Sequence, residues 1–369
     1  MPTVADLAGF LERFAPARSA ADWDNVGLLL GNAVGPADRV LTCLTVTSEV
    51  VNEAIAERAQ LIVSHHPVLF RAVKKLTGHT PDGRLLLPLL RAGIAVHSPH
   101  TAFDNCPGGI NDSLAVRMGL SNVAPLRPGT PAKSYKLVVF VPDSDLAKVS
   151  DALFAAGAGR IGQYEQCSYR LNGTGTFFGG DATNPTVGQK GRREEVAEWR
   201  LEVLVPEGSL GPALCAMRAA HSYEEPAFDV YPLHTRDAIA SHGEGRIGDL
   251  PETTLGELAR RAKERLGANG VQIVGDANRP VRRLAIACGA AGEFLADAIR
   301  VKADAFLVGE VRFHEALAAE AANIGLIVPG HYATERPAVE ELAERLAKEF
   351  PTATVWSSRR ERDPFSIPG

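Results

Sequence analysis

Two adjacent histidines are the first residues of this chain whose types and spacing suggest chemistry. His65 and His66 lie in VSHHPVLF, residues 63–70, directly after an apolar run that ends at Val63. Side chains of neighbouring strand residues point to opposite faces, but in a loop after the strand they can converge, and Pro67 favours an extended backbone there. The pair could serve two adjacent metal ions, one imidazole each, or could be polar residues that cap a loop.

Two further apolar runs end in residues of the same chemical kind. IAVHS leads into HSPHTAFDNCPGG, which supplies His97, His100 and Asp104, and GLIVPG leads into HYATERP, which supplies His331 and Glu335. The first segment could also be a polar loop with an aspartate in a turn. Folds with parallel sheets place ligand sites at the carboxyl ends of their strands. Three such ends carrying these residues therefore predict one shared site.

The segment after residue 330 also has a purely structural interpretation. Thr334 could be the N-cap of a helix with Pro337 in its first turn. This interpretation is compatible with a site, because it would fix Glu335 at the helix start and leave His331 in the preceding loop.

The combination of imidazoles and carboxylates without a thiolate indicates which metals the site would hold. Such donors suit a borderline divalent ion, namely zinc, iron or manganese. A carboxylate can bridge two ions, and Glu335 is the better bridging candidate than Asp104 because its side chain is longer.

The elements around these residues predict an α/β fold. Residues 39–63 form an apolar strand, a helix and a second apolar strand, and strands alternate with helices again after residue 280. Strands that are apolar along their whole length indicate a mostly parallel sheet covered on both faces. We therefore expect a core built from two halves of the chain around a mostly parallel sheet.

The middle of the chain has a different pattern. Strands at 136–142 and 200–206, helices after each, and an alternating polar and apolar stretch at 168–180 suggest two β-α-β halves of a ferredoxin-like α+β domain. The Pro- and Gly-rich stretch 125–134 and the polar stretch 234–250 are candidate linkers. The predicted division is a core domain of residues 1–127 and 246–369 with an inserted domain of residues 128–245.

Composition limits the function classes. The chain has 369 residues, 45% of them hydrophobic, and a net charge of -5 without a basic block. This argues against a nucleic-acid partner. The sequence has no apolar run of membrane-spanning length, and its amphipathic start is not a signal peptide. Five scattered cysteines without a CxxC motif suit a reducing cytoplasm.

Several motifs carry a family resemblance over nearly the whole chain. They are DWDNVGLLLG (22–31), SHHPVLF, HTAFDNCPGG, GEVRFHEA (309–316) and GHYATER (330–336), with GRIGQYEQCSYRLNGTGTFFGG (159–180) and HSYEEPAFDVYPL (221–233) in the middle. By these motifs the chain closely resembles the GTP cyclohydrolase one, type two homologues, also called NIF-three-like proteins. The two middle motifs resemble the insert of the longer bacterial members, which is similar to nitrogen-regulatory PII and CutA proteins.

The resemblance implies a dinuclear metal site, a homohexameric toroidal assembly and metal sites that face an internal cavity. The implied ligands of the two divalent ions are His65, His66, Asp104, His331 and Glu335. His100 matches a further family position near the metals. One departure is Tyr332, which stands where some members have a second histidine, and it removes none of the mapped ligands.

Two functions from different classes follow. The first is a metal-dependent hydrolase in which His100 shuttles protons. The family name implies opening of the guanine ring of GTP, while phosphoester or amide hydrolysis would suit the same metals. The second is a metal-binding regulatory or interaction protein whose PII-like insert senses a small molecule, without catalysis.

Four other stretches have alternative interpretations. Residues 287–295 could admit a backbone or an anion to a helix N-terminus, or could be tight strand–helix packing. Glu310 and His314 could support the metal ligands or form a pair within a helix. Residues 179–192 lack a phosphate-loop motif and predict a mobile loop. His221 with two following glutamates predicts a surface turn before an edge strand rather than a second metal site.

Overall fold

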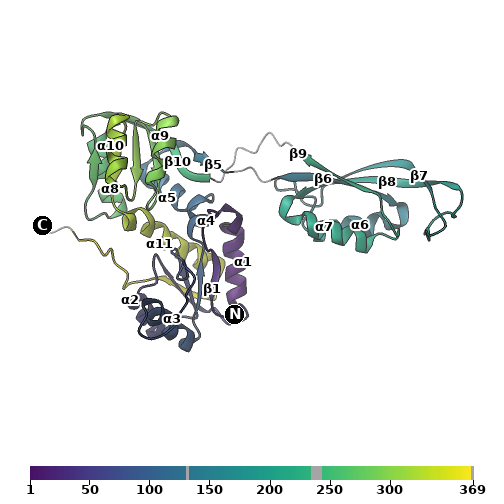
Figure 1. Cartoon of the computed structure of the whole chain (residues 1–369), viewed down its shortest axis with the longest axis horizontal. Helices are drawn as coiled ribbons and strands as arrows, with labels where there is room; N and C mark the ends of the chain where they lie inside the picture. The colour runs from purple at the N-terminus through teal and green to yellow at the C-terminus, as the bar shows by residue number, and fades with distance from the viewer. Residues whose placement is uncertain (130–132, 234–242, 367–369) are drawn as a thin grey trace. The chain divides into compact units, whose positions relative to one another are not determined.

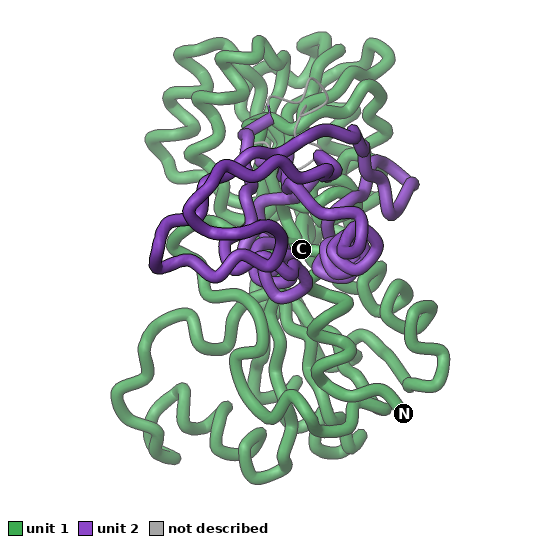
Figure 2. The backbone as a smooth tube through the Cα atoms, turned by 90° about the vertical axis from the view of Figure 1, so that its right-hand side faces the viewer, with its two compact units in different colours: residues 1–129, 240–369 green, residues 130–239 purple. Residues whose placement is uncertain are grey.

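The chain divides into two compact units. The computed structural model describes residues 1–129, 133–233 and 243–366. Unit 1 comprises Met1–Gly129 and Ala240–Gly369, and unit 2 comprises Thr130–Ile239 (Figure 2). The two candidate linkers fall partly outside the described residues. Their described ends are largely strand, because β5 (Ser121–Pro128) and β10 (Gly243–Thr254) pair antiparallel in unit 1.

The first sheet of unit 1 carries strands from both ends of the chain. Its order is β1-β4-β3-β2-β15. The strands are β1 (Gly27–Leu30), β2 (Arg39–Cys43), β3 (Leu61–Ser64), β4 (Ala95–Ser98) and β15 (Thr354–Ser357). β15, β2, β3 and β4 run parallel, and β1 pairs antiparallel with β4. β2, β3 and β4 are buried almost throughout, as the apolar runs predict.

The second sheet of unit 1 is mixed. Its order is β11-β14-β13-β12-β10-β5. Besides β5 and β10, its strands are β11 (Gln272–Val274), β12 (Pro280–Ala287), β13 (Ala305–Val308) and β14 (Gly325–Val328). β12, β13 and β14 run parallel, whereas β11, β10 and β5 join by antiparallel pairing.

The expectation of one mostly parallel sheet therefore needs a correction: the core contains two sheets, and only the first is mostly parallel. Helices explain the separation. The helices of unit 1 are α1 (Val4–Phe14), α2 (Ser48–Ala56), α3 (Pro81–Ala92), α4 (His100–Asn105), α5 (Ile110–Met118), α8 (Leu255–Leu266), α9 (Leu295–Arg300), α10 (Phe313–Ala321) and α11 (His331–Glu349). α5 and α11 lie between the sheets (Figure 1), so strands of the two halves cannot form one hydrogen-bonded sheet.

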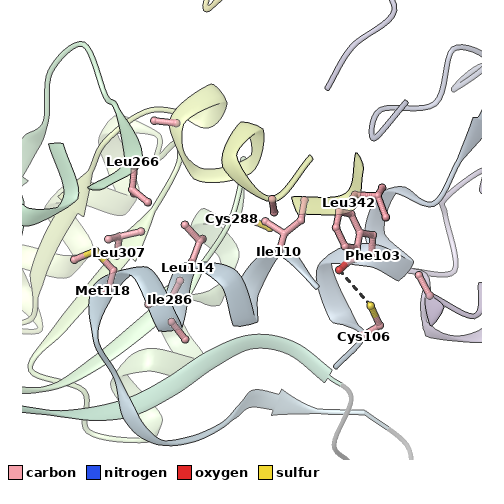
Figure 3. Close-up of a cluster of buried hydrophobic side chains, with 14 of the residues drawn as sticks. Phe103, Cys106, Ile110, Leu114, Met118, Leu266, Ile286, Cys288, Leu307 and Leu342 are labelled. Carbon is pink, nitrogen blue, oxygen red and sulfur yellow. Dashed lines mark hydrogen bonds between the residues drawn. The ribbon is translucent and has the colours of Figure 1, made fainter. Parts of the chain in front are cut away.

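One apolar cluster joins the sheets to these helices. Ile110, Leu114 and Met118 of α5 are fully buried within it, together with Ile286 of the second sheet and Leu61 of the first. Figure 3 shows the α5 side chains packed in a row within this cluster. Burying one large aliphatic side chain contributes roughly 1.5–3 kcal/mol. The cluster therefore fixes both sheets against the same helix and so positions the ends of their strands.

Unit 2 is a four-stranded antiparallel sheet with two helices. Its elements in chain order are β6 (Ser134–Pro142), α6 (Leu146–Ala155), β7 (Ser168–Phe178), β8 (Arg193–Pro206), α7 (Glu207–Ala220) and β9 (Phe228–Leu233). The sheet order is β7-β8-β6-β9. A separate apolar cluster, which includes Leu137, Val139, Leu153, Leu201 and Met217, lies between the sheet and its helices.

Candidate metal centre

The histidines and carboxylates singled out in the sequence gather within unit 1. His65 and His66 directly follow β3 of the first sheet. α4, which begins two residues after β4, carries His100 and Asp104. From the second sheet, α11 begins three residues after β14 and carries His331 and Glu335. The carboxyl ends of strands from both sheets thus supply one cluster, as the parallel pattern predicts.

The start of α11 differs from the expected cap. The helix begins at His331, so this histidine is not in a loop, and Thr334 lies inside the first turn. The Thr334 hydroxyl donates to the His331 carbonyl at 2.8 Å and accepts from the Gly289 N–H at 3.1 Å. The Thr334 side chain therefore accepts a hydrogen bond from a neighbouring loop and does not cap the helix. As a result, His331 and Glu335 lie four residues apart on one helical face.

The same spacing recurs on α4, where a loop was expected. His100 is its first residue and Asp104 lies four residues later. His100 has a φ of 31°, a region that residues with side chains rarely adopt. Backbone strain of this kind persists only where surrounding contacts hold it. Those contacts come from the buried Asp24 carboxylate, which binds both His100 and the backbone N–H of Thr101.

The Glu335 carboxylate is the centre of the cluster. This side chain is 4% exposed, and its Oε2 lies 2.9 Å from His331 Nε2, 3.0 Å from His66 Nε2 and 3.9 Å from His65 Nε2. His66 Nε2 and His331 Nε2 are 3.3 Å apart. Ligand atoms around a tetrahedral zinc ion with bonds of about 2.0–2.1 Å are separated by roughly 3.3 Å. His66, His331 and Glu335 therefore already have the spacing of metal ligands.

Three imidazoles have a hydrogen-bond partner at Nδ1, so their Nε2 atoms remain available to the cluster. His66 Nδ1 is 2.7 Å from the Thr45 hydroxyl, and His331 Nδ1 is 3.1 Å from Glu310 Oε1. His100 Nδ1 is 2.7 Å from Asp24 Oδ1. Histidines that bind metals characteristically donate their second N–H to such a partner, which fixes the tautomer and the ring orientation.

His65 provides the test of whether a metal fits. The residue is 2% exposed, and neither ring nitrogen has a hydrogen-bond partner in the described parts of the chain. Its Nε2 lies 3.5 Å from Asp104 Oδ1. An unpaired buried polar group costs free energy, and an ion held by His65 and Asp104 would remove that cost at Nε2. The donor set therefore fits a bound metal.

The electrostatics of the cluster separate its carboxyl groups. Burial, followed by the nearby Glu335 charge, raises the pKa of Asp104 to about 7. Against the effect of burial, hydrogen bonds from His331 and His66 hold the pKa of Glu335 well below its usual range. Burial lowers the pKa of His65 strongly, so its imidazole is neutral and able to act as a ligand.

His100 has the opposite electrostatic character to His65. Burial opposes its protonation, but the Asp24 hydrogen bond and the Asp104 charge raise the pKa of His100 above its ordinary value. The same hydrogen bond overcomes burial and lowers the pKa of Asp24 to about 2. Opposite charges therefore stabilise each other in this pair. His100 nevertheless lies close enough to His65 and His66 to share an ion with them.

Close contacts of Gly289 and Cys288 favour the tight-packing interpretation of residues 287–295. Gly289 has a φ of 64°, and a Cβ there would lie 2.2 Å from Glu335 Oε1. Cys288 donates from Sγ to Asp104 Oδ1 at 3.2 Å. The loop after β12 is thus packed tightly against the cluster. A cavity of about 180 Å³ opens beside it, lined among others by Trp23, His100 and Gly289.

Glu361, far away in sequence, holds the loop that carries Thr45. Its carboxylate accepts from the Leu44 N–H at 2.9 Å and from the Thr45 N–H at 2.6 Å. It also pairs with Arg336 of α11 at 3.0 Å. Because Thr45 contacts His66, this carboxylate supports the cluster from the side opposite to Glu335.

The sequence interpretation assigned these supporting residues only in part. Glu310 does contact a proposed ligand, but it precedes α10, whereas His314 is exposed and outside the cluster. Asp24 lies within the motif DWDNVGLLLG, but the sequence does not indicate its contact with His100, and Thr45 was not singled out. No sequence signal marks Asp24, because its burial, which demands a cationic or hydrogen-bonding partner, appears only in the structure. Which partner it takes depends on tertiary contacts.

The two sheets and the buried histidine–carboxylate cluster define an α/β protein with a candidate metal site. The chain belongs to the Duf34/NIF3 (NGG1p interacting factor 3) family, whose model matches residues 2–364. This confirms the resemblance that the sequence motifs indicated.

Curated relatives match over almost the whole chain. The GTP cyclohydrolase 1 type 2 homolog of Halalkalibacterium halodurans is 37% identical over 361 residues, which cover 96% of each chain. The protein of the same name from Bacillus subtilis is 36% identical over 362 residues, again 96% of each chain.

Solved structures support the same fold. A Bacillus cereus protein related to NIF3 superposes with a TM-score of 0.84 at 32% identity, covering 100% of this chain and 99% of that one. The Staphylococcus aureus protein SA1388 superposes with a TM-score of 0.79 at 28% identity, with the same coverage. Within the described ranges, no helix is both long and apolar enough to cross a membrane.

Proposed function

We propose that this protein binds two divalent metal ions and uses them to hydrolyse a nucleotide-like small molecule. The observation that carries the proposal is the Glu335 carboxylate, which lies within 3.9 Å of three imidazole Nε2 atoms. His65 and Asp104 would hold one ion, and His66 and His331 the other. Glu335 would reach both, and zinc, iron and manganese all suit these donors.

The bound ions, His100 and Asp24 would have different roles in the reaction. Two bound ions would supply Lewis acidity that activates water and stabilises a developing oxyanion. His100 would move a proton, because its Nε2 faces the cluster while Asp24 holds Nδ1 at 2.7 Å and stabilises the imidazolium. Asp24 acts through His100 and is therefore a positioning residue.

Two exposed aromatic rings beside His100 support the proposal that the substrate is flat. Trp23 and Phe70 are 64% and 48% exposed, and their ring centroids are 5.9 Å apart. They lie 6.1 Å and 6.3 Å from the His100 ring. The adjacent cavity of about 180 Å³ is smaller than the ~300–1,000 Å³ typical of small-molecule sites. It would hold only the reacting part of a nucleotide, while these rings contact the rest.

The lining of this cavity also limits the charge of the substrate. It contains no lysine or arginine among the described residues. The phosphates of a substrate such as GTP would therefore depend on the metal ions for neutralisation. A less charged phosphoester or amide would suit the same site equally well.

The proposal includes the organisation of the protein. Residues 128–245 would form an inserted ferredoxin-like domain of the PII and CutA type, supported by the order β-α-β-β-α-β and by the sheet order of unit 2. By family resemblance the chain would assemble into a homohexamer with its metal sites facing an internal cavity. The described cysteines are free, which suits a cytoplasmic location.

A second candidate is a metal-binding regulatory protein without catalysis. It is favoured by a cavity in unit 2 that is larger than the one beside the metal ligands, about 630 Å³ against 180 Å³. In this case unit 2 would bind a small molecule, and the metals would be structural or cargo.

Metal stoichiometry tests the site, and a substrate screen tests the function. Purified protein loaded with Zn²⁺ or Mn²⁺ should hold two equivalents, and Glu335→Ala and His66→Ala should each hold fewer. Glu344→Ala, on the exposed face of α11, and His314→Ala are matched controls that should keep both. Two full equivalents in both site variants would end the ligand assignment.

The screen would then offer GTP and simple phosphoesters to the loaded protein. Turnover that is lost in Glu335→Ala but kept in Glu344→Ala supports the hydrolase. Absence of turnover of every compound by the fully loaded protein favours the regulatory candidate.

A further inference from the structure

The cavity in unit 2 is a preformed space of the size that small-molecule sites have. Its volume of about 630 Å³ falls within the ~300–1,000 Å³ of ligand pockets. Phe140 of β6, the end of β7, residues 179–187 and the turn 223–227 surround it. It lies within unit 2 and shares no residue with the metal cluster.

Hydrogen bonds fix the two loops that wall the cavity. The Thr186 hydroxyl donates to the Ser222 carbonyl at 2.8 Å, and the Asn184 N–H donates to Glu224 Oε2 at 3.0 Å. The turn itself is held by His221, whose Nε2 donates to the Phe140 carbonyl and whose Nδ1 accepts from the Tyr223 N–H. Both His221 nitrogens are occupied, which argues against a second metal site. The turn precedes the edge strand β9, as the sequence predicted, but His221 itself is buried rather than on the surface.

The charge of the lining has a single sign. Glu198, Glu224 and Glu225 line the cavity, and no lysine or arginine does so among the described residues. Glu224 already accepts a backbone N–H and Glu198 lies beside the Tyr223 hydroxyl, but none of the three glutamates pairs with a cationic side chain in the described part of the chain. A phosphate or carboxylate ligand would be repelled here, and a cation would be attracted.

The remaining lining is apolar and aromatic. Phe140, Phe177 and Phe178 line the space, and Phe178 is 65% exposed. Aromatic faces attract cations, and they also pack against flat apolar groups. Aromatic rings beside unpaired carboxylates suit a ligand with an apolar body and a positively charged end.

A buried hydroxyl group points to the same ligand. Tyr223 lines the cavity, and its buried hydroxyl lies beside the Glu198 carboxylate. Burial, and then a hydrogen bond to Glu198, raise the pKa of this phenol, so it remains protonated and donates toward that carboxylate. Its oxygen still has lone pairs that can accept a hydrogen bond from a ligand. An ammonium group in the cavity could donate to this oxygen.

We propose that unit 2 binds a small organic cation, a primary amine or amidine attached to a flat apolar group. Glu198 and Glu225 bind the charged end, Tyr223 accepts a hydrogen bond from it, and the phenylalanine side chains pack against the apolar body. The proposal is independent of the metal centre and of any hydrolytic activity.

Three indoles that differ in charge test the proposal on the full-length protein. Tryptamine carries an ammonium, tryptophol a neutral hydroxyl and indole-3-propionate a carboxylate on the same ring system. By calorimetry or ligand-observed NMR, tryptamine should bind at least roughly tenfold more tightly than tryptophol, because a charged hydrogen bond contributes about that factor. Indole-3-propionate should not bind. Equal binding of the three, or tighter binding of the anion, would overturn the proposal.

Variants then locate the site. The double variant Glu198→Gln/Glu225→Gln should weaken tryptamine binding roughly tenfold or more. Glu165→Gln is the matched control and should bind normally, since Glu165 pairs with Arg160 on the surface outside this cavity. Tyr223→Phe should weaken tryptamine binding several-fold, while Glu165→Gln leaves it unchanged. Unchanged binding in both site variants would contradict the assignment.

Light scattering separates a ligand site from a contact between copies of the chain. The double variant should keep the oligomeric state of the wild type. If it instead changes the oligomeric state and the wild type binds no tryptamine, the surface is an interface between copies and the proposal is wrong.

Discussion

A glycine faces a glutamate carboxylate at nearly the same distance in each unit, and the two places differ in what surrounds the carboxylate. A Cβ at Gly289 would lie 2.2 Å from Glu335 Oε1, and a Cβ at Gly175 would lie 2.1 Å from Glu198 Oε2. Glu335 is 3% exposed and bound by two imidazoles, whereas Glu198 is half-buried at the edge of an open cavity. The first carboxylate is enclosed by its contacts, whereas the second has open space beside it. A clash distance alone therefore does not set the effect of a substitution.

The first and largest test removes His100, the proposed proton carrier of the buried cluster. His100→Ala should lower turnover roughly 10²–10⁴-fold, the range of general acid–base catalysis. Metal content should stay near normal, because the five other residues are the proposed ligands. Turnover is measured on the substrate that the screen identifies.

Asp24→Asn sharpens the same test. It should reduce turnover less than His100→Ala does, and it should shift the pH dependence of turnover to lower pH, because Asp24 raises the pKa of His100. Loss of metal from His100→Ala would make this histidine a ligand, and unchanged turnover would exclude it from the reaction.

The second test is Gly289→Ala. The added methyl group meets the enclosed Glu335 carboxylate and a φ of 64°. Overpacking and the left-handed backbone together should lower the free energy of unfolding by roughly 2–5 kcal/mol. Denaturant unfolding of the apo protein measures it. Gly267→Ala is the control, because its φ is 63° but no atom lies within 4 Å of the added Cβ. Equal losses in both variants would mean that the carboxylate moves aside.

The third test uses pH to probe burial at the edge of the cluster. His97 of β4 is 6% exposed, and burial lowers its pKa to about 4. Its contribution to stability is complete above the unfolded pKa near 6.5 and is lost as the pH falls through about 4. The total change is roughly 3 kcal/mol.

The free energy of unfolding should therefore fall more steeply between pH 6.5 and 4 in the wild type than in His97→Leu. The exposed His314→Leu is the control and should follow the wild type. If the free energy of unfolding fell with pH equally in the wild type and in His97→Leu, the pKa of His97 would not be lowered by folding.

The smallest effect is expected in unit 2. Gly175→Ala should change the free energy of unfolding by less than about 1 kcal/mol, because the Glu198 carboxylate can rotate away into solvent. Gly173→Ala is the control, with no atom within 4 Å of its added Cβ. If Gly175→Ala lowered the free energy of unfolding as much as Gly289→Ala, the surroundings of the two carboxylates would not explain the difference expected between them.

The sequence predicted the type of fold from local patterns but not the pairing of its strands. Apolar runs located β2, β3 and β4, and each is buried as expected. The division into two sheets depends on α5 and α11 filling the space between them, and this is a property of long-range packing. No periodicity in β5 or β10 indicates that they pair with each other.

The candidate site was predictable in its residues and less so in its geometry. His-x-x-x-Glu and His-x-x-x-Asp spacings were visible, but His100 and Asp104 were assigned to a loop, and only Glu335 of the other pair to a helix, although a separation of four residues is also the helical repeat. The supporting contacts of Asp24 and Thr45 join residues that are distant in sequence, so no local pattern could reveal them.

The contacts of Glu361 have a consequence for the order in which the protein can mature. The loop that holds His66 takes its final support from this residue, and Glu335 and His331 precede it by only about 30 positions. The contacts between Glu361 and this loop can therefore form only after codon 361 has been translated. Unit 2 is a continuous stretch that emerges earlier, so it can fold while the core around it is still incomplete. An ion entering the cluster would thus be acquired late, after unit 2 has already taken shape.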